Sequence, residues 1–283
     1  MSSILPAFFC GSVSHFVDSG FRVNQNAMPP VHYDTPAGLV ILFFAGLVAA
    51  AVNAFAGGGT LISFPVLIGL GVQEQVANAT NSMALWPGSL SSAIGFKDRF
   101  QATKHYYPSL IPATILGSTA GAWLMIVTPS STFRVLVPFL ILLATLVLAF
   151  QAKIKGWVTG PHGRTSVWTG ALLQFAISVY GGYFGAGMGI MMLAAMALFV
   201  EGDIHDMNAL KNSLAVLINI VAMGWFLAKG LVELVPCLAL MAGAIIGGYG
   251  SARVSQKVAS DKLRLGVVAY GLIMTAWFFI RLR

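Results

Sequence analysis

Long uninterrupted runs of apolar residues constrain the fold of this chain more than any other feature. In one of them, Phe133–Phe150, Arg134 is the only charged residue. Such a run fits an α-helix of about 20 residues that crosses about 30 Å of hydrocarbon, whereas the strands of a membrane barrel alternate over about ten residues. Only 9% of the residues are charged, against roughly a quarter in soluble domains, so these runs have to face lipid. The sequence therefore predicts an all-α, polytopic integral membrane protein.

The charged residues and the cysteines exclude several other classes of function. The net charge of +7 comes from 16 Lys and Arg against 9 Asp and Glu, and in a membrane protein such residues gather in short loops that set topology. We therefore expect no nucleic acid partner. Cys10 and Cys237 stand alone, without the spacing of a disulfide framework or a zinc site. We expect no metal and no cofactor. With no Ser/His/Asp set, HExxH or paired intramembrane carboxylates, we expect no catalytic residues and no enzyme.

Glycine, proline and charge clusters divide the chain into ten apolar segments. These are 37–55, 60–70, 78–96, 108–127, 133–151, 167–184, 190–200, 208–228, 232–251 and 263–280. Eight are long enough to cross a bilayer, whereas 60–70 and 190–200 would each reach about 17 Å as helices, roughly half of a bilayer. The sequence thus predicts about eight full transmembrane helices plus two short broken or re-entrant helices.

A shift of 130 residues superposes the two halves of the chain. Both glycine breaks coincide, Asn78 falls on Asn208, and Arg134 falls on Arg264. These coincidences predict an internal duplication. The expected organisation is an N-terminal tail that is mobile or interfacial (1–36), a first five-segment repeat (37–151), a basic linker (152–166) and a second five-segment repeat (167–283).

The sequence leaves the relative direction of the two repeats open. Re-entrant short segments would give four crossings per half and parallel repeats, whereas short segments that complete a crossing would give five and inverted repeats. The basic loop 252–262 favours inversion, but Lys229, Arg281 and Arg283 favour the parallel arrangement. Small residues four apart predict close helix packing in both halves. They are Ala113, Gly117 and Gly121, and Gly243, Gly247 and Ser251.

Two glycine-rich breaks in corresponding positions, 55–60 and 181–189, carry the strongest functional signal. Broken helices mark the substrate site in duplicated transporters, and glycines at a helix start leave N–H donors that suit an anion. The alternative is that these glycines only permit tight turns and close packing. Their recurrence at matching positions favours the functional interpretation.

Polar residues follow each break at the start of a long apolar helix. Helix capping explains Asn78 and Asn208 by themselves, but a second polar layer lies one turn further inside, where polar groups are costly. In that layer Lys211 could neutralise an anion, snorkel to the interface, or pair with Asp203 or Asp206. The predicted substrate-binding residues are Gly57, Gly58, Gly59, Thr60, Asn78, Thr80, Asn81, Ser82, Gly187, Gly189, Asn208, Lys211, Asn212 and Ser213.

The stretches 53–96 and 181–222 resemble the TauE/SafE family of sulfite-exporter-like permeases. In both, a glycine cluster and a short apolar segment precede a helix that starts Asn-Ala-Thr-Asn or Asn-Ala-Leu-Lys-Asn. The resemblance covers about 37–280. It implies a multi-pass protein of the bacterial inner membrane that exports a small anion, such as sulfite or another sulfur-containing organic acid, by secondary transport. Residues 1–35 depart from the family's usual short start.

Two other functions stay open at this point. A passive channel or cation carrier would use the acidic patch formed by Glu201, Asp203, His205 and Asp206, which we interpret as a solvated loop. A non-transporting membrane scaffold would use the glycines for packing alone. The expected partners are the lipid bilayer and a small anionic substrate, and the sequence leaves homo-oligomerisation open.

Overall fold

The structure, a computed structural model, describes residues 32–56, 58–95, 100–158, 165–201, 204–254 and 260–282. Within these ranges every regular element is a helix, which confirms the all-α prediction. Most of the predicted N-terminal tail lies outside the described residues.

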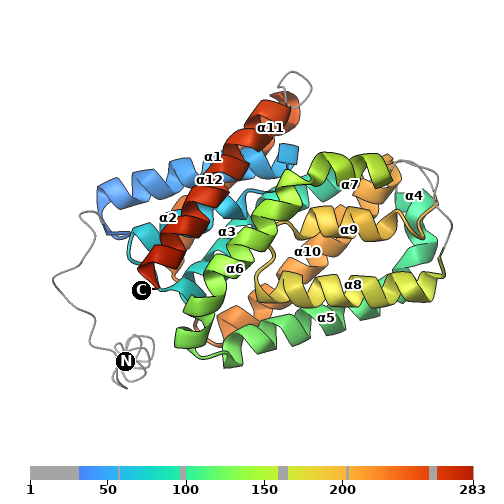
Figure 1. Cartoon of the computed structure of the whole chain (residues 1–283), viewed down its shortest axis with the longest axis horizontal. Helices are drawn as coiled ribbons and strands as arrows, with labels where there is room; N and C mark the ends of the chain where they lie inside the picture. Colours follow the sequence, from blue (N-terminus) through green and yellow to red (C-terminus); the bar gives the residue numbers. More distant parts are fainter. Residues whose placement is uncertain are drawn as a thin grey trace, which may run out of the picture. The chain divides into compact units, whose positions relative to one another are not determined.

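The helices follow the predicted segments closely (Figure 1). The first half contains α1 (Pro36–Ala56), α2 (Thr60–Gly69), α3 (Glu74–Gly95), α5 (Tyr107–Val127) and α6 (Ser130–Ala149). The second half contains α8 (Val167–Tyr183), α9 (Met188–Met196), α10 (Ile204–Ala228), α11 (Leu234–Val254) and α12 (Ser260–Arg281). Parts of the predicted basic loops are helical as well, namely α4 (Phe100–Thr103) with the 3₁₀ turn Lys104–Tyr106, and α7 (Gln151–Val158).

The helices α3 and α10 begin earlier than the sequence predicts. They start at Glu74 and Ile204, so Asn78 and Asn208 lie inside them and the interpretation of these asparagines as caps is wrong. Glu74 occupies the first turn of α3, where a carboxylate is favoured by the helix dipole. Its Oε1 lies 3.4 Å from Nε of Arg134.

Backbone contacts at glycines join the first half to the second. A Cβ at Gly243 of α11 would overlap the carbonyl oxygen of Phe43 in α1, and one at Gly247 would overlap that of Leu47. In the same way Gly117 and Gly121 of α5 lie against the backbone of α8, and these two helices run side by side in Figure 1. The structure thus confirms the predicted close packing. Because residue numbers rise together along each contact, α1 is parallel to α11 and α5 is parallel to α8.

The two short helices turn back along the helices that precede them. The start of α2 lies against α1, because a Cβ at Gly59 would overlap the carbonyl oxygen of Ala49. At the end of α2, Leu70 accepts a hydrogen bond at 3.1 Å from the amide of Tyr33, which precedes α1. In the second half of the chain, Leu198 after α9 accepts a hydrogen bond at 2.8 Å from the amide of Thr165, which precedes α8. Each short helix therefore forms a hairpin with its long neighbour.

The long helices α3 and α10 run in opposite directions. In the turn between α10 and α11, Glu233 donates its amide to Oγ1 of Thr80 in the first third of α3, at 3.0 Å. At the other end, Met207 and Leu210 of α10 pack with Tyr106, which follows α3 and α4 in the chain. The end of α10 thus meets the start of α3, and its start lies beyond the end of α3.

The same reasoning gives the directions of the remaining pairs. Nε2 of Gln75 donates to the carbonyl oxygen of Thr128 at 2.6 Å, so α5 ends beside the start of α3, where α11 begins. Consequently α5 and α11 are antiparallel, and so are their parallel partners α8 and α1. Segments that correspond under the 130-residue shift therefore run in opposite directions. The duplication itself stays a prediction.

The lengths and the exposed faces of these helices suit a bilayer. Among the described residues, four stretches are long and apolar enough to cross a membrane: Pro36–Asn53, Gln101–Val127, Ser130–Ala149 and Asp206–Ala228. Shorter apolar helices cover Thr60–Gly69, Leu234–Gly248 and Leu265–Arg281. Large apolar side chains such as Leu116 and Phe139 point outward and are more than half exposed. The protein is therefore a multi-pass membrane protein.

The glycine contacts predict that Gly243→Ala destabilises the fold. Its new methyl group has to displace the α1 backbone, and such overpacking costs about 1–3 kcal/mol of unfolding free energy. The readout is the melting temperature of purified protein in detergent. The matched control is Gly224→Ala in α10, where a Cβ meets no atom within 4 Å. Equal melting temperatures for Gly243→Ala and the control would contradict the described α1–α11 contact.

Candidate functional site

The first glycine break is tightly packed. A Cβ at Gly58 would lie 2.9 Å from Cδ2 of Leu148, and Gly59 presses on the α1 backbone as described above. Thr60 is the first residue of α2. Gly57 lies outside the described residues. For Gly59, whose neighbour is main chain, close packing is therefore a sufficient reason for glycine, whereas the neighbour of Gly58 is a side-chain methyl group that can shift.

The second break differs because two of its glycines have left-handed backbone angles. Gly185 has φ of 78° and Gly187 has φ of 75°, a region that favours glycine over other residues. Between them, the carbonyl oxygen of Ala186 accepts a hydrogen bond from the hydroxyl of Tyr180 at 2.6 Å. Gly187 directly precedes α9. The break is thus a short non-helical turn that joins the end of α8 to the start of α9.

Three of the predicted residues come together at the start of α9. A Cβ at Gly189 would lie 3.7 Å from Cδ of Lys211, so the aliphatic part of this side chain passes the first turn of α9. Nζ of Lys211 donates a hydrogen bond to Oδ1 of Asn208 at 3.0 Å. We call Gly189, Asn208 and Lys211 the lysine cluster.

A second group forms where α3 meets the end of α8. Nδ2 of Asn78 donates to the carbonyl oxygen of Tyr183 at 2.9 Å, and Oγ of Ser82 donates to the carbonyl oxygen of Asn78 at 2.9 Å. Asn78 and Asn81 are each only 1% exposed. We call Asn78, Asn81 and the Tyr183 carbonyl the asparagine cluster. Here the polar layer of the first half contacts the glycine break of the second half.

The other predicted residues have different neighbours. Thr80 is fully buried and accepts the amide of Glu233, so its hydroxyl ties the start of α11 to α3. Oγ of Ser213 donates to the carbonyl oxygen of Ala209 at 2.8 Å and accepts from the hydroxyl of Tyr107 at 3.0 Å. Asn212 is partly buried.

Sequence reasoning missed two tyrosines of this region. Tyr107 contacts Ser213 across 106 positions in the chain, a separation at which one sequence gives no pairing signal. Tyr183 contributes a main-chain carbonyl, which residue type does not reveal. Its place inside the glycine-rich stretch was the one available hint.

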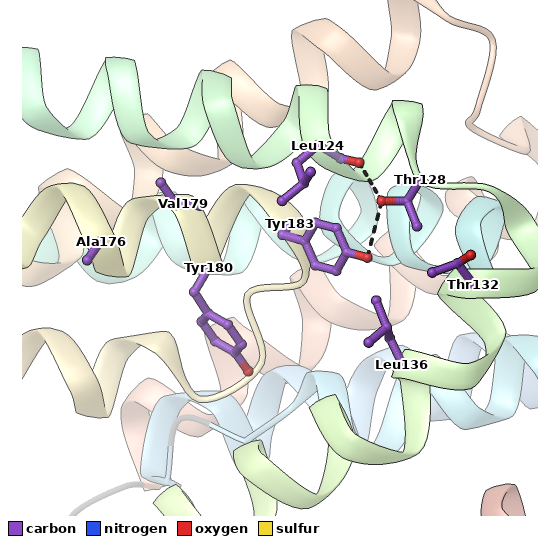
Figure 2. A pocket seen from close by; sticks show the side chains of 8 residues that line it. All are labelled: Leu124, Thr128, Thr132, Leu136, Ala176, Val179, Tyr180 and Tyr183. Atoms are coloured by element: carbon purple, nitrogen blue, oxygen red, sulfur yellow. Dashed lines mark hydrogen bonds between the residues drawn. The ribbon is translucent and has the colours of Figure 1, made fainter.

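A pocket of about 430 Å³ opens on the outer side of Tyr183, between α5, α6 and α8. It is lined by Leu124, Thr128, Thr132, Leu136, Ala176, Val179, Tyr180 and Tyr183. Figure 2 shows the hydroxyl of Tyr183 pointing to Oγ1 of Thr128, 3.5 Å away. None of the predicted substrate-binding residues that the structure describes lines this pocket. The pocket therefore does not contain Asn78 or Asn81, although Tyr183 contributes to both the pocket and the asparagine cluster.

The asparagine cluster predicts that Asn78→Ala destabilises the protein. The substitution removes the partner of a main-chain carbonyl that holds α8 against α3, and such a buried loss costs about 1–3 kcal/mol. The measurement is thermal unfolding in detergent. Ser82→Ala serves as the control, because the hydrogen bond of its hydroxyl runs to Asn78 within the same helix. A melting temperature of Asn78→Ala no lower than that of Ser82→Ala would contradict the described contact.

Comparison with known proteins is consistent with this architecture. Residues 42–278 match the family model described as Sulfite exporter TauE/SafE. A "Probable membrane transporter protein" of Haemophilus influenzae is 28% identical over 238 residues, which cover 84% of this chain and 93% of the relative. The "Probable membrane transporter protein YfcA" of Escherichia coli K12 is 25% identical over 248 residues, which cover 86% and 90%. No solved structure matches the chain.

These relatives are named as transporters and not as enzymes, in agreement with the prediction that the chain is not an enzyme. The family model covers most of the chain and includes both glycine breaks, the asparagine cluster and the lysine cluster. The chain therefore belongs to the TauE/SafE family.

Proposed function

We propose that this protein transports a small anion across the inner membrane, in the direction of export and by secondary transport. The substrate class is sulfite, a sulfonate or a related sulfur-containing organic acid. The observation that carries the proposal is Lys211, whose ammonium group lies within the apolar helix α10 and hydrogen-bonds Asn208 at 3.0 Å. A cation inside a membrane-spanning helix is costly, and a bound anion offsets that cost.

The position of Lys211 relative to α9 supports an anion as the cargo. The N-terminus of a helix carries a partial positive charge and unpaired N–H groups. Because the side chain of Lys211 passes Gly189 in the first turn of α9, two sources of positive potential lie in the same region. The left-handed turn at Gly187 sets the direction in which α9 begins.

The arrangement of the helices supports two inverted repeats, 37–151 and 167–283, as the basis of transport. Each half has five helical segments, and the short helix is one of them. The contact of α1 with α11 corresponds to that of α8 with α5, while α3 contacts α10 and α6 contacts α12. This is the pattern of a two-fold axis within the membrane plane. In transporters of this kind, one repeat moves against the other around a central site.

The names of the relatives and of the family model support the same function. The relatives are called membrane transporters, and the family model is described as a sulfite exporter. The alternative of a cation carrier would place the site at the acidic patch around Asp206, and a scaffold would carry no flux.

Replacement of Lys211 tests the site. Lys211→Met keeps the apolar length of the side chain and removes its charge, so we expect efflux of labelled sulfite or sulfonate from vesicles to fall at least tenfold, on the order of the 1.4 kcal/mol that a tenfold change represents. Lys229→Met is the matched control, because Lys229 is exposed in the turn after α10. Wild-type flux of every tested anion in Lys211→Met would show that the site is wrong. Cation flux lost in Asp206→Asn would favour the cation carrier, and flux equal to empty vesicles would favour the scaffold.

Cysteine labelling tests the inverted topology. In a background with Cys10→Ser and Cys237→Ser, single cysteines replace Asp34 before α1 and Thr165 before α8, both of which are exposed. Because α1 and α8 run in opposite directions, we expect a membrane-impermeant maleimide to label these two positions from opposite sides of the membrane. Labelling of both from the same side would contradict inversion.

A further inference from the structure

Two buried side-chain oxygens of α3 have no hydrogen-bond partner among the residues that the structure describes. They are Oδ1 of Asn78 and Oδ1 of Asn81, and both residues are 1% exposed. Buried polar atoms in native proteins are almost always paired with protein, water or an ion. Two unpaired oxygens within one helical turn therefore indicate a bound species.

The geometry at Asn78 fixes the chemistry that this species must have. Nδ2 of Asn78 donates to the carbonyl oxygen of Tyr183 at 2.9 Å, so the free atom of this amide is the oxygen, which is an acceptor. Residues three apart on a helix lie on one face, with Cβ atoms about 5–6 Å apart. Asn78 and Asn81 thus offer neighbouring carbonyl oxygens. These attract a cation or a donor and repel an anion.

The end of α8 adds negative potential at the same place. Tyr183 is the last residue of α8, and the C-terminus of a helix carries a partial negative charge. The chain then continues without helical structure to Gly187. In transporters with broken helices, Na⁺ is bound by unwound main-chain carbonyls and by the C-terminal ends of half-helices.

We propose that the asparagine cluster binds a hard monovalent cation, Na⁺, between α3 and the end of α8. Oxygen ligands suit a hard cation. A proton does not fit the site, because an amide does not titrate. A transition metal does not fit it either, since the described residues contain no group of three His, Cys, Asp or Glu side chains. The cation site shares no residue with the lysine cluster, which holds the anion.

Together the two clusters give the transporter a pair of sites with opposite charge preference. If inward movement of Na⁺ is coupled to outward movement of the anion, the inward Na⁺ gradient drives the export that the sequence left without an energy source. This coupling rests on the proposed function. Binding of Na⁺ does not, because it can be measured without transport.

The test is the melting temperature of the purified full chain in detergent as Na⁺ replaces N-methyl-D-glucamine at constant ionic strength. A ligand that binds the native state raises the melting temperature with its concentration, so we expect a rise with Na⁺. A series in which K⁺ replaces Na⁺ measures selectivity, and a smaller shift with K⁺ is expected. The absence of a Na⁺-dependent shift in melting temperature overturns the proposal, and this is the result that water at these oxygens would give. A K⁺-dependent shift as large as that with Na⁺ overturns it as well.

Substitutions of Asn81 test whether the Na⁺-dependent shift arises at the asparagine cluster. Asn81 is chosen because the hydrogen bond to the carbonyl oxygen of Tyr183 comes from Asn78. Asn81→Ala is expected to lose the Na⁺-dependent shift, whereas Asn81→Asp adds a full negative charge and is expected to bind Na⁺ about tenfold more tightly, the equivalent of 1.4 kcal/mol. Asn219→Ala in α10 is the matched control and retains the wild-type shift. A shift that persists in Asn81→Ala, or an unchanged affinity in Asn81→Asp, overturns the site.

The transport assay separates the two proposals. In vesicles that carry the wild-type protein, a Na⁺ gradient is expected to change the rate of sulfite or sulfonate flux, and Asn81→Ala is expected to remove this dependence. Na⁺-dependent stabilisation without any anion flux would contradict the proposed function and leave the cation site standing. Anion flux that does not depend on Na⁺, in a protein that Na⁺ does not stabilise, would contradict the cation site and leave the proposed function standing.

Discussion

Close backbone contact at small residues is the interaction on which the rest of this structure depends. In a bilayer no hydrophobic force drives helices together, because lipid tails are as apolar as the side chains. The glycines of α11 and α5 let these helices lie directly on the backbones of α1 and α8. Each contact joins one half of the chain to the other. The packing of the two halves is therefore built on residues without side chains.

This packing places polar groups of one half against the broken helix of the other. Asn78 of α3 reaches the carbonyl of Tyr183 at the end of α8, and Glu233 reaches Thr80. Such bonds are made inside apolar surroundings, where unsatisfied amides and carbonyls are costly. The site and the fold therefore rely on the same contacts, and a movement of one half against the other has to exchange them.

The sequence predicted the elements well and the individual roles less well. Apolar runs gave the helices because a bilayer demands about 20 apolar residues per crossing. The interpretation of Asn78 and Asn208 as helix caps was wrong, because α3 and α10 start at Glu74 and Ile204. Local rules do not fix the exact start of a helix. Gly59 is explained by packing against α1, whereas Gly189 lies beside Lys211, and the assignment of these residues to a substrate site stays a prediction.

By itself the sequence determined that the chain is a multi-pass helical membrane protein, where its long and short helices lie, and which residues interrupt them. These follow from composition and from local steric rules. Only the tertiary structure decided that α2 and α9 fold back along their neighbours, that corresponding helices run in opposite directions, and that the free atom of the Asn78 amide is its oxygen. Such features depend on contacts between residues far apart in the chain, such as the 105 positions between Asn78 and Tyr183, and no local pattern encodes them.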